Sequence, residues 1–212
     1  MMAVIPATLV IELLSDTTFG RGEGTPGVVD VEVEHDAYGL PMLGGKALRG
    51  LVRDSWLSMQ AHFPELVVSG RRVLGPHADV DEAGIVRIGD ATIDAQARRF
   101  FVWSVKREQH RIAPATILAA LTDVRAQTAE DRRSGAPSAT TLRSTRVTIR
   151  GLRLIAQLNW LVEPDMTDLR CLALAALATR HGGLGRNRGR GHLRITIEGD
   201  VERTRDLARG VS

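Results

Sequence analysis

The residues best suited to chemistry in this chain form a glycine- and arginine-rich stretch at residues 182–191. Glycine lets backbone N–H groups approach an anion closely and adopts positive φ, and arginine guanidinium groups bind phosphate oxygens through paired hydrogen bonds. The stretch therefore predicts a loop that binds a polyanion through these residues: Gly183, Gly185, Arg186, Arg188 and Arg190. A flexible, solvated loop is the alternative, because Gly-Arg tracts also occur in disordered arms.

A second set of cations lies near the start of a predicted helix. The helix is expected to begin near Gly45 and to end before Pro64, with this inward stripe: Leu48, Leu51, Val52, Ser55, Met59 and Phe63. The helical period places Lys46, Arg49 and Arg53 on another face, close to the free N–H groups and the positive dipole of the helix start. We therefore expect these three cations and Gly45 to contact phosphates. An ordinary solvated amphipathic face is the alternative.

Several extended and helical segments must position these two groups. Alternating apolar residues predict strands over about 4–14, 28–35 and 152–160, and a half-buried strand that starts directly after Gly191. Asp165 or Thr167 is expected to cap a further helix, which Gly182 stops. Together these elements indicate an α+β fold with a ferredoxin-like or RRM-like core.

Residues from about 65 to 150 are expected to form an insertion of hairpins within a single domain of residues 1–212. The part from about 122 to 146 has little to bury, so we expect it to project from the core as a thumb. Arg125, Arg132 and Arg143 of this thumb are predicted to contact the polyanion, and the thumb is expected to become ordered on binding. A disordered linker is the competing interpretation.

Composition narrows the classes of protein to which this chain can belong. Only Lys46 and Lys106 are lysines among 28 basic residues, a choice that suits phosphate recognition, although a GC-rich genome produces the same bias. Aromatic residues make up 4% of the chain, so any nucleic-acid contacts are expected to be mostly with the sugar-phosphate backbone. No apolar run of about 18 residues and no signal sequence is found, so we expect a cytoplasmic protein without a membrane partner. The six histidines lack metal-binding spacing.

Four segments follow one another in an order that resembles a known family. They are the loop and helix start at 39–53, the run Arg-Ile-Gly-Asp-Ala at 87–91, the thumb segments 122–125, 131–132 and 141–143, and the Gly/Arg loop at 182–191. Their order is similar to that of the RAMP superfamily, and most closely to the crRNA-binding backbone subunit of type III CRISPR effector complexes. Arg49 stands where the family motif has lysine, and Ile88 where it often has phenylalanine.

The resemblance implies a catalytic and metal-binding role for Asp30. Asp30 lies six positions before Asp36, as the target-cleaving aspartate of the family does relative to the same turn. It would help to hold a divalent metal, Mg²⁺, or position an attacking 2′-hydroxyl, and a metal-bound carboxylate stabilises the charge that develops at a phosphodiester. From the residues alone, an aspartate at a strand edge is more often structural or solvated.

The resemblance also implies partners and an activity. The partners would be crRNA, target RNA, neighbouring copies of this chain in a filament and other type III effector subunits, within a prokaryotic cytoplasm. The activity would be that of a metal-dependent endoribonuclease that works within the assembled complex. Two alternatives stay open: a non-cleaving structural guide-binding subunit, and a RAMP-type endonuclease that processes the guide precursor.

Overall fold

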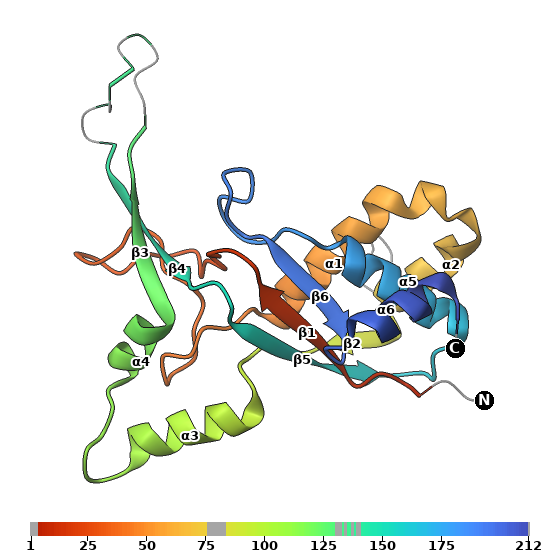
Figure 1. The fold of residues 1–212 in the computed structure, drawn as a ribbon, viewed down its shortest axis with the longest axis horizontal. Helices are drawn as coiled ribbons and strands as arrows, with labels where there is room; N and C mark the ends of the chain where they lie inside the picture. The colour runs from red at the N-terminus through yellow and green to blue at the C-terminus, as the bar shows by residue number, and fades with distance from the viewer. Residues whose placement is uncertain are drawn as a thin grey trace.

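The structure is a computed structural model that describes residues 4–75, 84–129 and 141–211, together with positions 133, 135, 136 and 138. A four-stranded antiparallel sheet with the strand order β2-β5-β1-β6 forms its centre. The strands are β1 (Thr8–Leu13), β2 (Val86–Ile88), β5 (Arg153–Trp160) and β6 (Leu193–Ile197). Figure 1 shows them as neighbouring arrows in the middle of the molecule.

Two helices give the sheet its topology. Helix α1 (Gly45–Met59) lies in the connection from β1 to β2, and α5 (Met166–Ala178) lies in the connection from β5 to β6. Each β-α-β unit has a strand of the other unit between its own two strands. This interleaving is the ferredoxin-like arrangement, so the predicted α+β class and core are confirmed.

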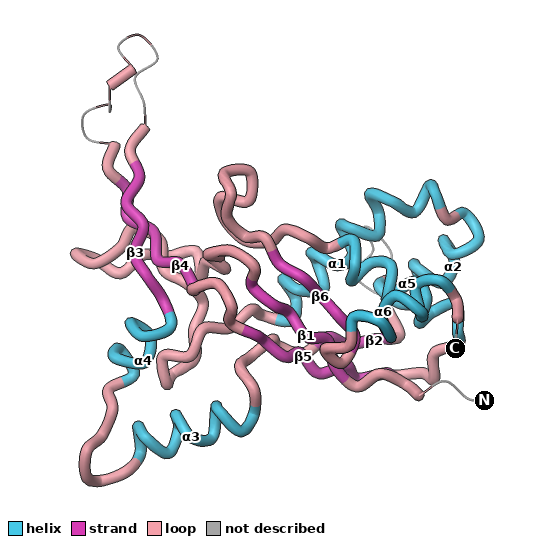
Figure 2. Tube along the Cα trace, in the orientation of Figure 1, coloured by secondary structure: helices cyan, strands magenta, loops and turns pink. Residues whose placement is uncertain are grey.

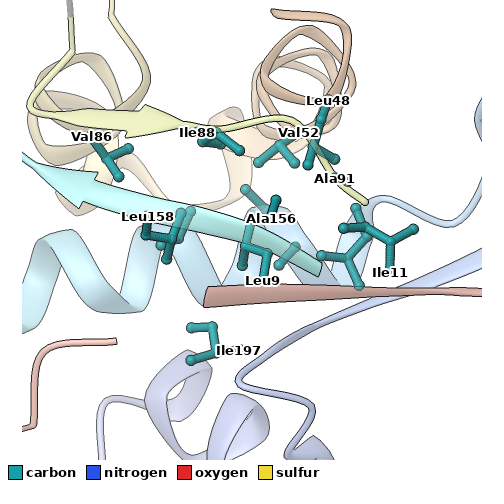
Figure 3. Packing of buried hydrophobic residues seen from close by; sticks show 14 of the residues in the cluster. Leu9, Ile11, Leu48, Val52, Val86, Ile88, Ala91, Ala156, Leu158 and Ile197 are labelled. Carbon is teal, nitrogen blue, oxygen red and sulfur yellow. The ribbon is translucent and has the colours of Figure 1, made fainter. Parts of the chain in front are cut away.

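The hydrophobic core lies between the sheet and the helices that cover one of its faces. Alternation along β1 turns Leu9, Ile11 and Leu13 toward these helices, and all three side chains are 0% exposed. Figure 3 shows Leu48 and Val52 of α1 lying over the sheet residues. Burying each such side chain contributes roughly 2 kcal/mol, which fixes α1 and the loop before it against the sheet.

Helix α5 is the central helix of the covered face. It packs against α1, α2 (Val67–Leu74) and α6 (Val201–Arg209). Asp165 caps α5 as predicted, because its carboxylate accepts the N–H of Asp168 while the Asp168 carboxylate accepts the N–H of Asp165. Helix α6 was not predicted. Its buried residues are Thr204, Leu207 and Ala208, and charged side chains fill most of its other positions, so its apolar face is short.

The middle of the chain contains the predicted projecting hairpin, but most of its other elements are helices and not hairpins. It contains α2, α3 (Ala95–Lys106) and α4 (Pro114–Leu121), and one hairpin made of β3 (Thr122–Gln127) and β4 (Arg143–Thr148). The short apolar run at 100–105 does not distinguish a strand from a helix, whereas the Asp94 carboxylate caps the first turn of α3 by accepting two backbone N–H groups. Helices α3 and α4, which we call the helical arm, and the β3–β4 hairpin extend away from the main sheet (Figures 1 and 2).

The run at 28–35 is extended, as predicted, but it is not a regular strand. Its residues make isolated bridges to separate segments: Val29 to Thr25, Val31 to Thr145, Val33 to Gly20 and His35 to Pro41. Glu32, an acidic residue of this run, is buried, with 2% of its surface exposed. Within the described residues, no helix has the length and apolarity that crossing a membrane requires.

Candidate nucleic-acid interface

The Gly/Arg loop is held at its base by backbone hydrogen bonds. The Gly182 N–H donates to the Gly191 carbonyl (2.9 Å) and the Gly191 N–H to the Asp16 carbonyl (3.0 Å). Further along, the Leu184 N–H donates to the Thr18 carbonyl (2.9 Å). These contacts join both ends of the loop to the segment after β1, so the interpretation as an unanchored flexible arm does not hold at the base of the loop.

Two glycines of this loop have a steric requirement. Gly183 has φ +81° and Gly191 has φ +70°, both in the region that disfavours side chains. A Cβ at Gly183 would overlap the Thr18 carbonyl, and a Cβ at Gly191 would overlap the Gly182 carbonyl. Only glycine at these two positions allows the loop to lie this close to the neighbouring backbone. The side chains of Arg186 and Arg188, between them, are exposed.

A cavity of about 400 Å³ joins the loop to the other predicted elements. Its lining residues come from the segment after β1, the extended run, α1 and the Gly/Arg loop: Thr18, Phe19, Gly20, Gly22, Glu23, Asp30, Val31, Glu34, Leu43, Ala47, Leu51, Gly183 and Leu184. The structure therefore brings Asp30, the face of α1 that carries Ala47 and Leu51, and the Gly/Arg loop to one side of the molecule.

The Asp30 carboxylate is bound to the base of the β3–β4 hairpin. Its Oδ2 accepts hydrogen bonds from the Ser144 backbone N–H (2.6 Å) and from the Ser144 hydroxyl (3.0 Å). These two hydrogen bonds, followed by the charge of Arg143, hold the pKa of Asp30 below its ordinary value. The exposed carboxylate therefore stays charged at neutral pH. Its side-chain hydrogen bonds with described residues all use Oδ2, which leaves Oδ1 available.

A buried ion pair next to Asp30 was missed by sequence reasoning. Arg146 Nε lies 2.8 Å from Glu32 Oε1, with the two side chains 13% and 3% exposed. The Nε geometry is that of an ion pair and not of a hydrogen bond. The Glu32 carboxylate also accepts the Thr25 hydroxyl and the Val33 N–H, each at 3.0 Å. This pair fixes the extended run against β4, and hence Asp30 against the hairpin.

The start of α1 differs from the prediction of free N–H groups. The Gly45 N–H donates to Asp90 Oδ1 (2.8 Å) and the Gly44 N–H donates to Glu34 Oε2 (3.2 Å). The Asp90 carboxylate therefore occupies the Gly45 amide, which had been assigned to phosphate, and the Glu34 carboxylate occupies the amide of the residue before it. A Cβ at Gly45 would overlap the Ile88 carbonyl, which explains a glycine at this position and the contact between the two motifs.

The cations of α1 do not line the cavity. Lys46 is exposed, and Arg53 is half-buried. The Arg49 guanidinium donates to the Leu74 carbonyl through Nε (3.2 Å) and Nη2 (2.9 Å), so it caps the end of α2. Arg49 thus has a structural partner that sequence spacing did not indicate, and the face toward the cavity is the one with Ala47 and Leu51.

The hairpin carries the remaining predicted cations. Arg125 pairs with Asp16 (2.8 Å) and with Asp123 (3.1 Å), and these contacts raise its pKa above the ordinary value. Arg143 is exposed at the start of β4, close enough to affect the charge of Asp30. Arg132 lies outside the described residues.

Asp30 offers a single carboxylate for a metal. Among the described residues, no group of three or more His, Cys, Asp or Glu side chains is arranged to hold an ion. Mg²⁺ is commonly bound by one or two carboxylates together with water and substrate phosphates, and the uncommitted Asp30 oxygen at an exposed cavity edge fits that mode. Neither His35 nor His110 is a lining residue of this cavity.

Comparison with known proteins places the fold. No protein-family model matches the chain, and no curated protein does. A solved chain of Type III-B Cmr-beta in the apo state has a TM-score of 0.68 and 12% identity, and the match covers 93% of this chain and 98% of that chain. A chain of Type III-B Cmr-beta bound to cognate target RNA has a TM-score of 0.62 and 10% identity, with coverage of 96% and 99%. The present chain therefore shares its fold, over nearly its full length, with chains of Type III-B Cmr-beta complexes.

Proposed function

We propose that this chain is a crRNA-binding backbone subunit of a type III CRISPR effector complex. The fold supports the proposal, because the match spans nearly all of this chain and of chains from such complexes. The observation that carries it is the placement of the anchored Gly/Arg loop and Asp30 around one cavity. The predicted phosphate-binding element and the predicted cleaving residue thus lie where one RNA strand can reach both.

The guide would be held by its phosphates at the Gly/Arg loop. Arg186 and Arg188 project from a loop whose base is tied to the core, so they bind a phosphate without first ordering the chain around them. Lys46 adds an exposed charge near the start of α1, whereas Arg49 is held by the end of α2. The loop is therefore the main grip, and α1 is secondary.

Asp30 would take part in metal-dependent cleavage of target RNA paired to the guide. Its charged carboxylate would help to hold Mg²⁺, which when bound neutralises charge at a phosphodiester. Ser144 holds one carboxylate oxygen and thereby orients the other. Val31, Leu51 and Leu184 form an apolar part of the wall of the same cavity.

The projecting hairpin supports a further part of the proposal. The β3–β4 hairpin, whose Ser144 binds Asp30, extends away from the main sheet (Figure 1). Copies of the chain packed side by side along one guide would each place a hairpin across the guide-target duplex. Target cleavage would then recur at regular intervals, once per copy.

Substitution of Asp30 tests the cleavage step. In the complex reconstituted with guide RNA, Asp30→Ala should slow Mg²⁺-dependent cleavage of target RNA by roughly a hundredfold or more, with guide binding unchanged. Asp30→Asn removes the charge but keeps an oxygen that accepts the Ser144 hydrogen bonds, so it distinguishes loss of charge from loss of this contact. Glu163→Gln, which removes an exposed carboxylate elsewhere, serves as the control. Unchanged cleavage in both Asp30 variants would remove Asp30 from the mechanism.

Substitution of the loop arginines tests the guide grip. The triple variant Arg186→Ala/Arg188→Ala/Arg190→Ala should weaken guide binding and reduce the salt dependence, with a slope change of about 0.7 per lost phosphate contact. Arg209→Ala, which removes an exposed arginine from α6, is the matched control. Equal affinity and equal salt slope in both proteins would contradict the proposed grip.

The two remaining alternatives have distinct outcomes. Among the described residues, no group of three or more His, Cys, Asp or Glu side chains is arranged to hold an ion, which is compatible with a guide-binding subunit that does not cleave. Intact assembly without metal-dependent cleavage would select this alternative. Cleavage of repeat RNA by the isolated chain would instead select a guide-precursor-processing endonuclease.

A further inference from the structure

A second cavity lies next to the base of the Gly/Arg loop, at the edge strand β6. Its volume is about 290 Å³. The lining comes from the ends of β1 and α5, from β6 and from α6, and consists of Leu14, Leu177, Arg180, His192, Leu193, Arg194, Ile195, Val201 and Arg205. Three arginines and a histidine stand among apolar residues, and no lining residue is acidic. The first cavity has the opposite character, because Glu23, Asp30 and Glu34 line it and no arginine or lysine does.

The β6 edge contributes a backbone donor to this cavity. The Glu198 N–H donates to the Thr8 carbonyl, and the His192 carbonyl accepts the Leu14 N–H just after β1. Hydrogen-bonded positions alternate along an antiparallel pair, so the N–H groups of Leu193, Ile195 and Ile197 point away from β1. The outer two are used, since Leu193 donates to the Arg180 carbonyl (2.9 Å) and Ile197 to the Thr204 hydroxyl (2.9 Å). Within the described residues, the Ile195 N–H between them has no acceptor. A single edge amide thus faces a cavity lined by arginines.

The arginines of this cavity are either unpaired among the described residues or held only by accessible acidic partners. No described residue pairs with the Arg180 guanidinium. Arg205 pairs with Glu202 on the surface of α6, with side chains 52% and 70% exposed, and Arg194 lies 3.6 Å from Glu12 with both side chains accessible. Exposed pairs of this kind contribute about 0–1 kcal/mol, so a phosphate can displace them at little cost.

We propose that this cavity is a phosphate-binding site for a nucleotide unit, separate from the Gly/Arg loop. Arg180 and Arg205 would bind the phosphate oxygens from two sides and the Ile195 N–H would donate from the sheet edge. The apolar floor formed by Leu177 and Val201 would support the sugar or base. The inference deepens the proposed RNA-binding function, because Arg180 and His192 directly flank the Gly/Arg loop and place the site next to any strand that the loop holds.

An added peptide strand does not fit this edge. Strand addition needs a row of free backbone groups along the edge strand, but the Leu193 and Ile197 N–H groups are already used. One free amide surrounded by guanidinium groups matches a compact anion instead. An acidic peptide is therefore an outcome that the experiment can reveal and not the ligand that the geometry favours.

The test compares the pocket variant Arg180→Ala/Arg205→Ala with Arg209→Ala in the purified full chain. Arg209 lies on α6, as Arg205 does, and has the same kind of i,i+3 acidic partner, but it is not a lining residue of the cavity. Binding of a short single-stranded RNA and of AMP is measured at several salt concentrations. The pocket variant should bind RNA roughly tenfold more weakly, with a slope smaller by about 0.7 per lost contact, and Arg209→Ala should match the unsubstituted protein. Arg180→Lys/Arg205→Lys should recover part of the affinity because it restores the charge.

The outcomes separate this site from the Gly/Arg loop. If AMP binding is also lost in the pocket variant, a free nucleotide can supply the phosphate; if only RNA binding weakens, the phosphate belongs to the strand. Both results support the site. Equal binding of the pocket variant and Arg209→Ala to both probes would overturn it, even when the loop variant Arg186→Ala/Arg188→Ala/Arg190→Ala loses RNA. A loss in the pocket variant alone would support the site and count against the loop grip. Preferential binding of an acidic peptide over both probes would also overturn it.

Discussion

The charge of Asp30 depends on a partner far away in the sequence. Ser144 supplies the two hydrogen bonds that lower the Asp30 pKa most, and its backbone N–H has the larger effect. A depressed folded-state pKa means that the contact favours folding above the ordinary pKa of an aspartate and is lost as the pH falls through the lower, folded value. Chemistry that needs the charged carboxylate should therefore be insensitive to pH near neutrality and fail only in acid.

Removal of the Ser144 hydroxyl tests this account. Ser144→Ala should raise the Asp30 pKa part of the way to its ordinary value, because the backbone N–H still donates to the carboxylate. The measurement is an NMR titration of the Asp30 carboxylate, with Ser138→Ala as a control on the same hairpin. An Asp30 pKa that is identical with and without the hydroxyl would show that Ser144 Oγ has no part in holding the charge.

The start of α1 shows how two motifs depend on each other. Gly45 lies against the Ile88 carbonyl and donates its N–H to Asp90, so the helix and the 87–91 run form one contact. The sequence indicated both motifs but assigned the helix start to phosphate. The Asp90 carboxylate already occupies the positive end of the helix, because the end of β2 holds Asp90 within hydrogen-bond distance of the Gly45 N–H.

Two glycines of α1 provide a matched pair for this contact. Gly45→Ala should destabilise the fold by roughly 2 kcal/mol or more, because its Cβ would overlap the Ile88 carbonyl. Gly50→Ala should stabilise it by about 0.5–1 kcal/mol, since that Cβ meets open space in the same helix. Urea unfolding followed by circular dichroism measures both. Similar effects of the two substitutions would show that the close approach at Gly45 does not limit stability.

Apolar side chains are buried to very different extents in two parts of the molecule, the helices packed on the sheet and the helical arm. Helix α5 buries Asp168, Leu169, Cys171, Leu172, Ala173, Ala175 and Ala176, whereas Ser104 is the buried residue of α3. Phe100 and Trp103 of α3 are 59% and 55% exposed. The arm therefore has less apolar burial to resist local opening than the core does.

Hydrogen exchange should reveal this difference. Amides of α3 are expected to exchange at least roughly 100-fold faster than those of α5 in the isolated chain, because opening α3 exposes little buried surface. Exchange measured by mass spectrometry on peptides that cover residues 95–106 and 166–178 provides the comparison. Equal protection of the two helices would show that the arm opens only together with the core.

Local pattern was sufficient for the elements whose own residues carry the signal. The alternation in β1, β5 and β6, the capped start of α5 and the spacing of the four motifs were readable because each depends on neighbours within a few residues. The same information was ambiguous for the short apolar runs between 65 and 150, which are mainly helices. It missed α6 because the apolar face of that helix is short.

Long-range contacts determined the site itself. The partners of Asp30, Glu32, Gly45 and Arg49 are Ser144, Arg146, Asp90 and the Leu74 carbonyl, each at least 25 residues away in the chain. No local period encodes such pairings, because they form only when packing brings segments that are distant in the chain into contact. Residue types in this chain thus indicated affinity for phosphate and an acidic cleavage group, while packing selected which cations stay free for a ligand and which are used to hold the fold together.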